Sequence, residues 1–518
     1  MIQTPFIQME QIESGPATKA TKLESMSKQQ LIERNTVLEF ELGQLVKELY
    51  ELRHQKLTDE QLQFVMAEQI QSLTDAIYKK KSERYKKPIK NDDGNDDGAD
   101  KAANPRVKRP SERYPNIPIR TEVVAMDPVP ACGECNNPMF DTGMREESEQ
   151  LTVIPKKYEI CVKSRVIYGC HCHSCLVTTP APARMIEGST YSDEMITDVA
   201  LSKYCDLIPI NRYVAMADRA GLVDLPANSL IETTHSFADF VSPVYTLIKK
   251  GILKSRVLKA DETPHKMLEG DEKTNWYLWG FSTDELCFLE CRNTRSGDIA
   301  SDILMKSQCE VLVSDVYTGY GKAIRVANEA RQSRQLPLIA AAHCNAHARR
   351  NFFKMWPQYK EAAFYLDHYH EIYQLNSKSK GQDPPLVLEL RSQMRPRFEA
   401  MKAKAMEELA CYSLRGKYVK ALKYFLKNYD TLTLFLADAE VPIDNNAQER
   451  NLRSHVIGRK TWYGTHSKRG ALTAAILFSI VETCKLAQVN PRQYFENLVK
   501  NLLAGDKPYT PAEYKKSL

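Results

Sequence analysis

The sequence predicts a multidomain α+β protein, and three observations support that fold class. The chain has 518 residues, too many for one ordinary domain and enough for two to four. Between about residues 253 and 315, apolar runs of strand length follow one another, and the flanking segments show helical periodicity. Six of the thirteen cysteines lie between Cys132 and Cys175. We therefore expect an N-terminal helix, a cysteine-rich module, a central α/β core with a helical insertion, and a helical C-terminal part.

Composition excludes several classes of protein. The chain is 43% hydrophobic and 26% charged, with a net charge of +5 and a mean hydropathy of −0.45. Its longest clean apolar run, residues 471–481, is about half of the ~20 residues that a membrane-spanning helix needs, so it predicts a buried helix. The first residues lack the basic start and apolar core of a signal peptide. We expect a cytoplasmic protein with no membrane contact, whose clustered cysteines bind metal and do not form disulfides.

Residues 25–85 are predicted to form a leucine-zipper-like coiled coil. Leucines recur every seven residues, and a second set follows the first by four residues, with one asparagine in it. The two sets are Leu31, Leu38, Leu45 and Leu52, and Asn35, Leu42 and Leu49. A polar residue at one such position is typical of a parallel two-stranded coil. We expect a homodimer or higher oligomer through this zipper; a single amphipathic helix packed on its own domain is the alternative.

Residues 86–120 are predicted to form a charged flexible linker. Residues 78–90 carry seven Lys or Arg against one Glu, residues 91–100 are acidic, and residues 101–120 are basic again with four prolines. Blocks of like charge with repeated proline and glycine favour a solvated segment. Weak contact of its basic parts with a nucleic-acid backbone is the alternative.

Residues 121–180 are predicted to form a zinc-binding knuckle. Two CxxC pairs supply four thiolates at paired spacing, which suits a closed structural zinc site: Cys132, Cys135, Cys172 and Cys175. Cys170 could replace Cys172, and His171 or His173 could also serve. Free buried thiols or a redox pair remain the alternative. Residues 181–252 then show a helical pattern, which indicates a DNA-binding or connecting region.

Two carboxylates are expected at the ends of strands in the core. A strand over residues 256–260 should stop at Asp261, and an apolar strand over residues 311–314 should stop at Asp315. A hairpin, TNWYLWGF followed by ELCFLECR, lies between them. Two close carboxylates repel unless a cation lies between them, and hard oxygen ligands select Mg²⁺ or Mn²⁺. Each acid alone is also a common turn residue, and Glu262 is a competing ligand that strand alternation would point away.

Glu449 is the candidate for a third carboxylate. Asp444 or Asn445 can cap a helix that places Glu449 in its early turns. The twenty residues from Arg450 to Arg469 include four Arg, two Lys and two His, and no acid. A carboxylate at the head of a basic surface suits a metal site that acts on a phosphodiester.

Further basic residues are candidates for DNA contact. Arg349 and Arg350 should open a helix after another core strand, where they could bind phosphate, and His347 could do so or simply pack. On the helix after Glu449 the candidates are Arg450, Arg453, Arg459 and Lys460. For Trp462, core packing is preferred over stacking on a base. The pattern is mostly helical between Phe352 and Glu440, and again after Asp444 with breaks near Gly464 and residues 490–491.

These residues lie in motifs that resemble the IS66-type family of insertion-sequence transposases. In chain order the motifs are TPAPARMIEG (179–188), SKYCDLIPINR (202–212), ADET (260–263), SDVYTGY (314–320), HCNAHARRNFF (343–353), DNNAQERNLR (444–453), GRKTWYG (458–464) and ETCKLAQVNPRQYF (482–495). The zipper, the KKKSER segment (79–84) and the cysteine knuckle also occupy their family places. The chain departs from the family at Val316, where glycine is usual, and at Asn345, where tryptophan is frequent.

The resemblance implies a ribonuclease-H-like catalytic core over residues 253–480, with a helical insertion at about 357–440 and a helical region at 481–518. It places a DDE triad on Asp261, Asp315 and Glu449, which would hold two Mg²⁺ or Mn²⁺ ions. The implied activity is cleavage and strand transfer at the terminal inverted repeats of an insertion sequence, joined to a target duplex. Companion proteins of the element and a bacterial, nucleoid-associated location are also implied. A nuclease that does not join strands and a non-catalytic DNA-binding regulator are the alternatives.

Overall fold

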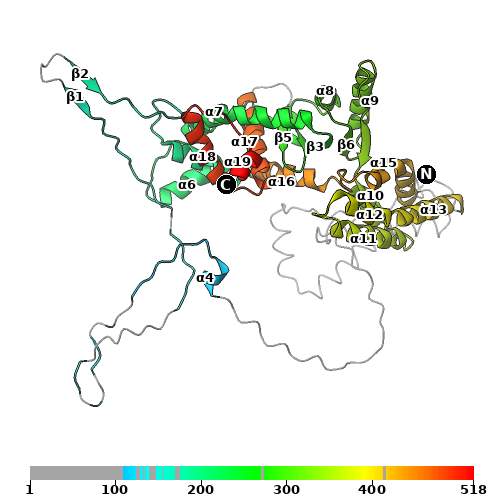
Figure 1. Cartoon of the computed structure of the whole chain (residues 1–518), viewed down its shortest axis with the longest axis horizontal. Coiled ribbons are helices and arrows are strands. Elements are labelled where there is room, and N and C mark those ends of the chain that lie inside the picture. Colours follow the sequence, from blue (N-terminus) through cyan, green and yellow to red (C-terminus); the bar gives the residue numbers. More distant parts are fainter. Residues whose placement is uncertain are drawn as a thin grey trace, which may run out of the picture. The chain divides into compact units, whose positions relative to one another are not determined.

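Figure 1 shows the computed structural model of the chain. It describes residues 109–517 except 124, 125, 127, 128, 132, 133, 135, 139–147, 155, 170–174, 270–273 and 412–415. The predicted coiled coil and most of the predicted linker therefore lie outside the described residues. The described residues divide into two contact units, one formed by Asn345–Ala439 and the other by the residues before Asn345 together with those from Glu440 onward. We call them the helical unit and the sheet unit.

The described part of the cysteine-rich module consists of short paired segments. Strands β1 (Ile167–Gly169) and β2 (Leu176–Thr178) form an antiparallel hairpin around the second CxxC. An isolated antiparallel bridge joins Ala131 and Pro138, which flank the first CxxC in the sequence. Of the four predicted zinc ligands only Cys175 is described, and it is exposed. The zinc site stays a prediction, since Cys132, Cys135 and Cys172 lie outside the described residues.

A mixed five-stranded sheet is the centre of the sheet unit, and with the surrounding helices it confirms the α+β class. Its strands are β3 (Val257–Lys266), β4 (Asn275–Ser282), β5 (Cys287–Arg292), β6 (Val311–Ser314) and β7 (Ala340–His343). Their spatial order is β5-β4-β3-β6-β7. The β3–β4 and β4–β5 pairs are antiparallel, so the predicted hairpin is present, and β6 and β7 add in parallel.

One strand boundary was predicted wrongly. The strand expected to end at Asp261 continues to Lys266, because β4 pairs with it as far as Lys266 opposite Asn275. On its other side the pairing with β6 ends at Lys259, opposite Val313. Asp261 therefore lies within a strand, but at the point where one of its two neighbours has ended.

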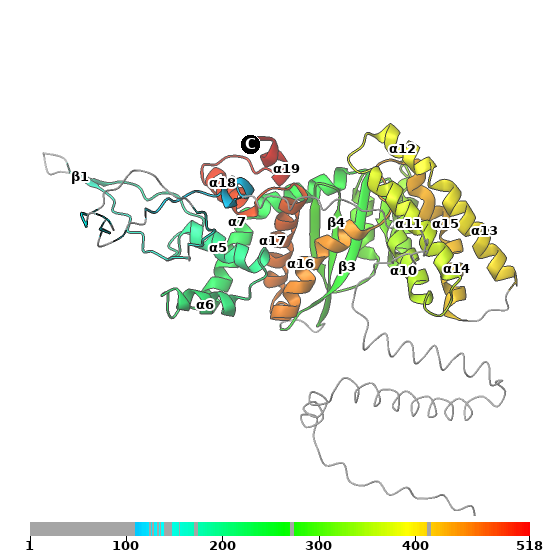
Figure 2. The same ribbon diagram turned by 90° about the horizontal axis from the view of Figure 1, so that it is seen from below.

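Helices cover both faces of this sheet, as the directions of two adjacent β4 side chains show. A Cβ added to Gly280 would meet the side chains of Gln448 and Leu452 on α16 (Asn446–Trp462). The neighbouring Trp279 ring instead makes an edge contact with Tyr320 of α9 (Thr318–Gln332), at 5.9 Å between centroids. Because successive strand residues point to opposite faces, α16 and α9 lie on opposite faces of the sheet. Figure 2 shows α16 lying across β3 and β4.

The outer edge of β5 is closed by a helix. Leu289 N–H donates to Ser479 Oγ at 2.8 Å, and Cys287 N–H donates to Thr483 Oγ1 at 3.1 Å. The two hydroxyls stand four residues apart on α17 (Lys468–Leu486) and face alternate residues of the strand. The apolar run 471–481 is buried in this helix, as its composition predicts. The arrangement satisfies edge-strand donors that would otherwise be exposed or unmade.

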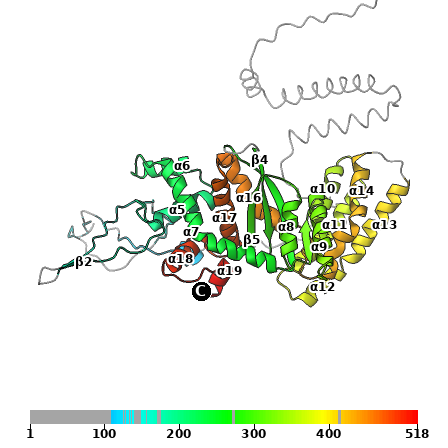
Figure 3. The ribbon, with the colours of Figure 1, turned by 90° about the horizontal axis from the view of Figure 1, so that it is seen from above.

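Five further helices of the sheet unit pack around α17 and the long α7 (Ala227–Lys254), as Figure 3 shows. They are α5 (Asp193–Tyr204), α6 (Ile210–Arg219), α8 (Asp298–Lys306), α18 (Pro491–Leu503) and α19 (Pro511–Ser517). The short α4 (Pro110–Arg113) precedes the cysteine-rich module. Breaks predicted near Gly464 and residues 490–491 separate α16, α17 and α18. Among the described residues no single helix has the length and apolar content of a membrane span; α17 and α18 reach it only together, across a 118° bend.

The helical unit, as far as it is described, contains no strand. Its helices are α10 (Asn345–Met355), α11 (Ala362–Lys378), α12 (Pro384–Ser392), α13 (Arg395–Cys411), α14 (Lys417–Lys427), α15 (Tyr429–Thr433) and the 3-10 helix η1 (Leu434–Ala437). Its core is aromatic, with Phe352 stacked on Tyr365 at 4.1 Å. Asn345, where the family often has tryptophan, is buried and donates to the carbonyl of Leu432 at 2.8 Å.

Candidate metal centre and nucleic-acid interface

Asp261 points to the face of the sheet that α16 covers. It pairs with Gly280 across β3 and β4, and directly paired residues point to the same face. Gly280 is the residue over which Gln448 of α16 packs, at a distance that leaves no room for a Cβ. Glycine at this position thus allows α16 to approach the strand that carries Asp261. One carboxylate oxygen of Asp261 accepts the Glu262 N–H at 2.9 Å.

Asp315 lies beside Asp261 by the register of the parallel strands. Val257 pairs with Val311 and Lys259 with Val313, an offset of 54 that puts residue 315 opposite residue 261. Asp315 follows β6 directly, as predicted, and its Oδ1 accepts the Tyr317 N–H at 3.0 Å. Neighbouring strands are about 4.8 Å apart, so the two aspartates start from adjacent backbone positions.

Glu449 lies in the first turn of α16, as the sequence predicts, but the helix begins differently from the expected capping. Asn445 occupies the N-cap position without a side-chain capping bond. Its side-chain N–H donates to the Ala260 carbonyl at 2.8 Å, while Asp444 Oδ1 accepts the Asn446 N–H at 3.1 Å. The Asn445 side chain therefore attaches the helix to β3, at the residue before Asp261.

Asp261 feels the charges of the other two acids. The pKa of Asp261 is raised to about 7, first by burial and then by the charges of Glu262, Asp315 and Glu449, while the Glu262 N–H lowers it. A carboxyl that feels three other acids in a partly buried place holds its proton because ionisation adds to an already negative site. The structure thus brings Asp261, Asp315 and Glu449 together at one end of the sheet.

Glu262 is committed to other partners. It pairs with Trp279 in the sheet and so points to the α9 face, opposite to Asp261. Its carboxylate accepts from Arg295 Nη2 at 2.7 Å and from the Tyr320 hydroxyl at 2.5 Å. Burial still raises its pKa, although these two donors lower it. The competing ligand is therefore held by an arginine and a tyrosine on the far face.

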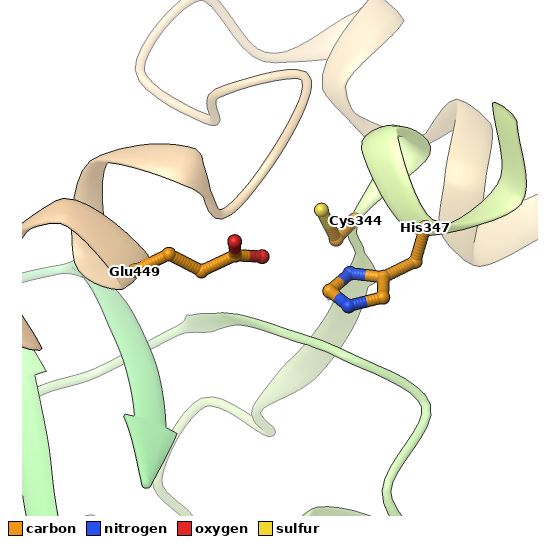
Figure 4. Close-up of side chains that lie close together, drawn as sticks. All are labelled: Cys344, His347 and Glu449. Atoms are coloured by element: carbon orange, nitrogen blue, oxygen red, sulfur yellow. The ribbon is translucent and has the colours of Figure 1, made fainter. Parts of the chain in front are cut away.

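The Cys344 side chain lies close to Glu449. Figure 4 shows the Glu449 carboxylate pointing from α16 toward the thiol at the end of β7, and the two ligand atoms are within 4.8 Å. The Asn445 N–H donates to Cys344 Sγ at 3.2 Å. The third side chain in that view, His347, belongs to α10 of the helical unit. Cys344 is fully buried and is a site-adjacent residue that sequence reasoning did not single out.

A basic stripe continues along α16 from Glu449. Arg450, Arg453 and Lys460 are exposed and recur at helical spacing, so they share one side of the helix. None of the three forms an ion pair within the part of the chain that the structure describes. Arg459 is half-buried, and burial lowers its pKa. Of the four basic residues predicted on this helix, Arg450, Arg453 and Lys460 therefore present their charges to solvent.

The predicted pair Arg349 and Arg350 lies in the helical unit, on α10. Both side chains are half-buried, and the Arg349 guanidinium stands 5.8 Å from the Phe353 ring centroid. The helix begins directly after Cys344, as the sequence predicts for a helix following a core strand.

The aromatic residues near the acids pack within the protein. The Tyr317 hydroxyl donates to the Arg295 carbonyl at 2.9 Å, and Tyr320 is buried against Glu262. Trp462 packs against the hydrophobic core and folds back over Gly458. The contacts of Trp462 agree with the predicted preference for core packing over stacking on a base.

A buried histidine pair is a second feature that the sequence did not reveal. His265 of β3 and His455 of α16 stack at 5.1 Å, and their facing ring nitrogens are 3.2 Å apart. Burial and the charge of Arg459 lower the pKa of His265 to about 4, and the pKa of His455 also falls well below its usual value. The sequence alone does not pair these two histidines, because they are 190 residues apart and come together only when α16 packs along β3.

A mixed sheet with clustered carboxylates beside a basic helix fits a protein that acts on nucleic acid, and comparisons with known proteins identify the family. Residues 188–473 match the model of the transposase IS66 family, which spans more than half of the chain. The chain therefore belongs to the IS66 family of transposases. Membership implies action on DNA and use of divalent metal ions.

Curated relatives extend the similarity over most of the chain. Uncharacterized protein y4hP of Sinorhizobium fredii (strain NBRC 101917 / NGR234) is 25% identical over 440 residues, covering 79% of this chain and 78% of its own. From the same organism, uncharacterized protein y4qI is 24% identical over 415 residues, covering 77% and 76%. Uncharacterized protein y4jD is 25% identical over 402 residues, covering 74% and 77%.

Proposed function

We propose that this chain is a DDE transposase that cleaves and joins DNA strands at the ends of an IS66-type insertion sequence, with Asp261, Asp315 and Glu449 as its catalytic acids. The observation that supports this best is the position of Asp261, whose pKa is raised to about 7 by burial and by the charges of Glu262, Asp315 and Glu449. Asp315 and Glu449 lie 54 and 188 residues after Asp261 in the chain. They come close to Asp261 because β6 and α16 both pack beside β3. The mixed sheet also supports a ribonuclease-H-like core.

The acids fit a pair of hard divalent cations. Carboxylate oxygens are the ligands that Mg²⁺ and Mn²⁺ prefer, and cations between them relieve the repulsion that raises the Asp261 pKa. The nearby guanidinium of Arg295 is engaged by Glu262 on the other face. We assign the ligand role to Asp261, Asp315 and Glu449. When bound, such ions polarise a phosphodiester and stabilise charge on the attacking and leaving oxygens.

The chain's own residues would bind and orient the DNA. Arg450, Arg453 and Lys460 follow Glu449 on one side of α16 and would neutralise phosphates next to the acids. We propose the same role for Arg459, and for Arg349 and Arg350 in the helical unit. In the first step water attacks a phosphodiester at the end of the element and releases a 3′-hydroxyl. That hydroxyl then attacks a phosphodiester of the target strand, whose 3′-oxygen leaves as the new bond forms.

Further parts of the proposal concern assembly. We propose that residues 25–85 join two or more copies, that the cysteine knuckle binds one structural Zn²⁺, and that residues 181–252 contact DNA or connect the knuckle to the core. The hairpin β1–β2 supports the knuckle, because its two paired strands flank the second CxxC in the sequence. Companion proteins of the same element and a location on the bacterial nucleoid belong to the same proposal.

Substitution of the acids tests the catalytic assignment. We expect Asp261→Asn and Glu449→Gln each to lower Mg²⁺-dependent cleavage of a terminal-repeat duplex by at least about a thousandfold, because each removes a charge that holds the metals. Cleavage is measured on a labelled strand. Asp284→Asn is the matched control, since this acid pairs with Lys259 on the same sheet, and it should cleave at the wild-type rate. Unchanged cleavage by Asp261→Asn would contradict the assignment.

A further inference from the structure

We propose that Asn445 and the His265–His455 pair are positioning residues, which hold α16 along β3 so that Glu449 stands beside Asp261. This inference rests on the proposed metal site. It concerns residues that touch neither the DNA nor the reacting groups, and it assigns them the alignment of two ligands that come from distant parts of the sequence.

The first attachment is at the start of α16. The Asn445 side chain donates to the Ala260 carbonyl at 2.8 Å, and its backbone N–H donates to Cys344 Sγ at 3.2 Å. Asn445 is 1% exposed, so both bonds are shielded from water. One residue thereby ties the helix to β3 immediately before Asp261 and to the end of β7. An ordinary N-cap asparagine would bond its own helix, which this side chain does not do.

The second attachment lies farther along the helix. His265 and His455 are buried, and the bond between their ring nitrogens needs one donor and one lone pair. The other nitrogen of His265 stands 2.8 Å from Thr465 Oγ1. Thr465 in turn donates its N–H to the Lys266 carbonyl at 3.0 Å and accepts the Leu268 N–H at 2.8 Å. The end of α16 is thereby fixed to the end of β3.

The two attachments are matched in length. Ten residues of helix separate Asn445 from His455, a rise of about 15 Å at 1.5 Å per residue. Five residues of strand separate Ala260 from His265, about 17 Å at 3.3 Å per residue. Helix and strand therefore run side by side in the same direction. Glu449 and Asp261 both fall between the two attachments, so neither can slide along the other without breaking one of them.

Metal affinity in the absence of DNA is the measurement that isolates positioning. Mn²⁺ binding to the full chain is followed by the loss of the free-ion electron paramagnetic resonance signal, and the unfolding temperature of the metal-free protein is recorded in parallel. We expect Asn445→Ala to weaken Mn²⁺ binding roughly 10- to 100-fold, the range for residues that orient metal ligands. His455→Phe, which keeps a ring but loses the bond, should weaken it in the same direction, and His455→Gln should recover part of the loss.

Ser479→Ala is the matched control. It removes a buried hydrogen bond of the same kind, between a helix side chain and sheet backbone, on α17 at the outer edge of β5, two strands away from Asp261. We expect it to lower the unfolding temperature and to leave Mn²⁺ affinity unchanged. Should Asn445→Ala fail to fold, Asn445→Ser keeps a good N-cap residue, yet its hydroxyl is too short to reach Ala260.

The Glu449→Gln variant distinguishes a failure of the proposed metal site from a failure of the positioning role. If it binds Mn²⁺ as tightly as the wild type, the proposed metal site is wrong. If it weakens binding while the Asn445 variants bind like the wild type or like Ser479→Ala, the metal site stands and the positioning role is wrong. Weakened binding in Glu449→Gln, Asn445→Ala and His455→Phe, with none in Ser479→Ala, is the result the proposal predicts.

Discussion

Asp261 is the residue on which the electrostatic part of the account depends. Its raised pKa has burial as the first cause and the charges of Glu262, Asp315 and Glu449 as further ones. A site that holds several carboxylates together without a compensating cation costs free energy in the folded state. Such cost is common where function and not stability sets the residue type.

The cost predicts a pH-dependent effect of Asp261→Asn on stability. The folded pKa of about 7 exceeds the unfolded value of about 3.9, so the charged carboxyl destabilises the fold increasingly as the pH rises between these values. In metal-free protein we expect Asp261→Asn to raise the free energy of unfolding by on the order of 2 to 4 kcal/mol at pH 8. At pH 4 the gain should nearly vanish. Thermal unfolding at the two pH values measures it, and an equal gain at both would contradict the electrostatic account.

The individual acids could be predicted from the sequence to different degrees. Asp315 follows the apolar run VLVS, and the end of that strand was placed correctly. Asp261 was expected at a strand end and lies inside β3, because local sequence does not show that β4 pairs beyond it. Asn445 and the two histidines could not be assigned, since their roles come from contacts across more than 180 residues.

At the scale of elements, α16 has a side that packs on the sheet and a basic side that faces solvent. Its inner side packs on β3 and β4 through Gln448 and Leu452, and its outer side carries Arg450, Arg453 and Lys460. The basic surface was predicted from composition, because the residues from Arg450 to Arg469 include four Arg and two Lys and no acid. The inner side was not predicted, since Gly280, which makes room for it, belongs to a strand far away.

The basic side of α16 predicts a salt-dependent contribution to DNA binding. We expect the triple variant Arg450→Gln, Arg453→Gln and Lys460→Gln to weaken binding of a terminal-repeat duplex and to reduce the slope of log affinity against log salt by about 3, roughly one per phosphate contact. Fluorescence anisotropy over a salt series measures both. Arg469→Gln is the control, because this exposed arginine is already paired with Glu232 and Asp239. An unchanged slope in the triple variant would show that this side of the helix does not face DNA.

At the scale of the whole molecule, the proposed acids come from both sides of an insertion. In the sequence, the helical unit is inserted between Cys344 and Glu440 of the sheet unit. Asp315 therefore precedes the insertion and Glu449 follows it. The helices between Phe352 and Glu440 were anticipated from their pattern, and the central sheet from its apolar runs. The zipper and three of the zinc ligands lie outside the described residues and stay predictions.

Family membership and clustered acids also fit an enzyme that cuts without joining, and one measurement separates that reading from a transposase. A terminal-repeat duplex that already ends in a 3′-hydroxyl is incubated with the full-length chain, Mg²⁺ and a supercoiled target plasmid. Our account predicts joined product with the wild type, none with Glu449→Gln, and none when the end lacks its 3′-hydroxyl. Wild-type protein that cleaves its terminal repeats but never joins the pre-cut end to the target would contradict it.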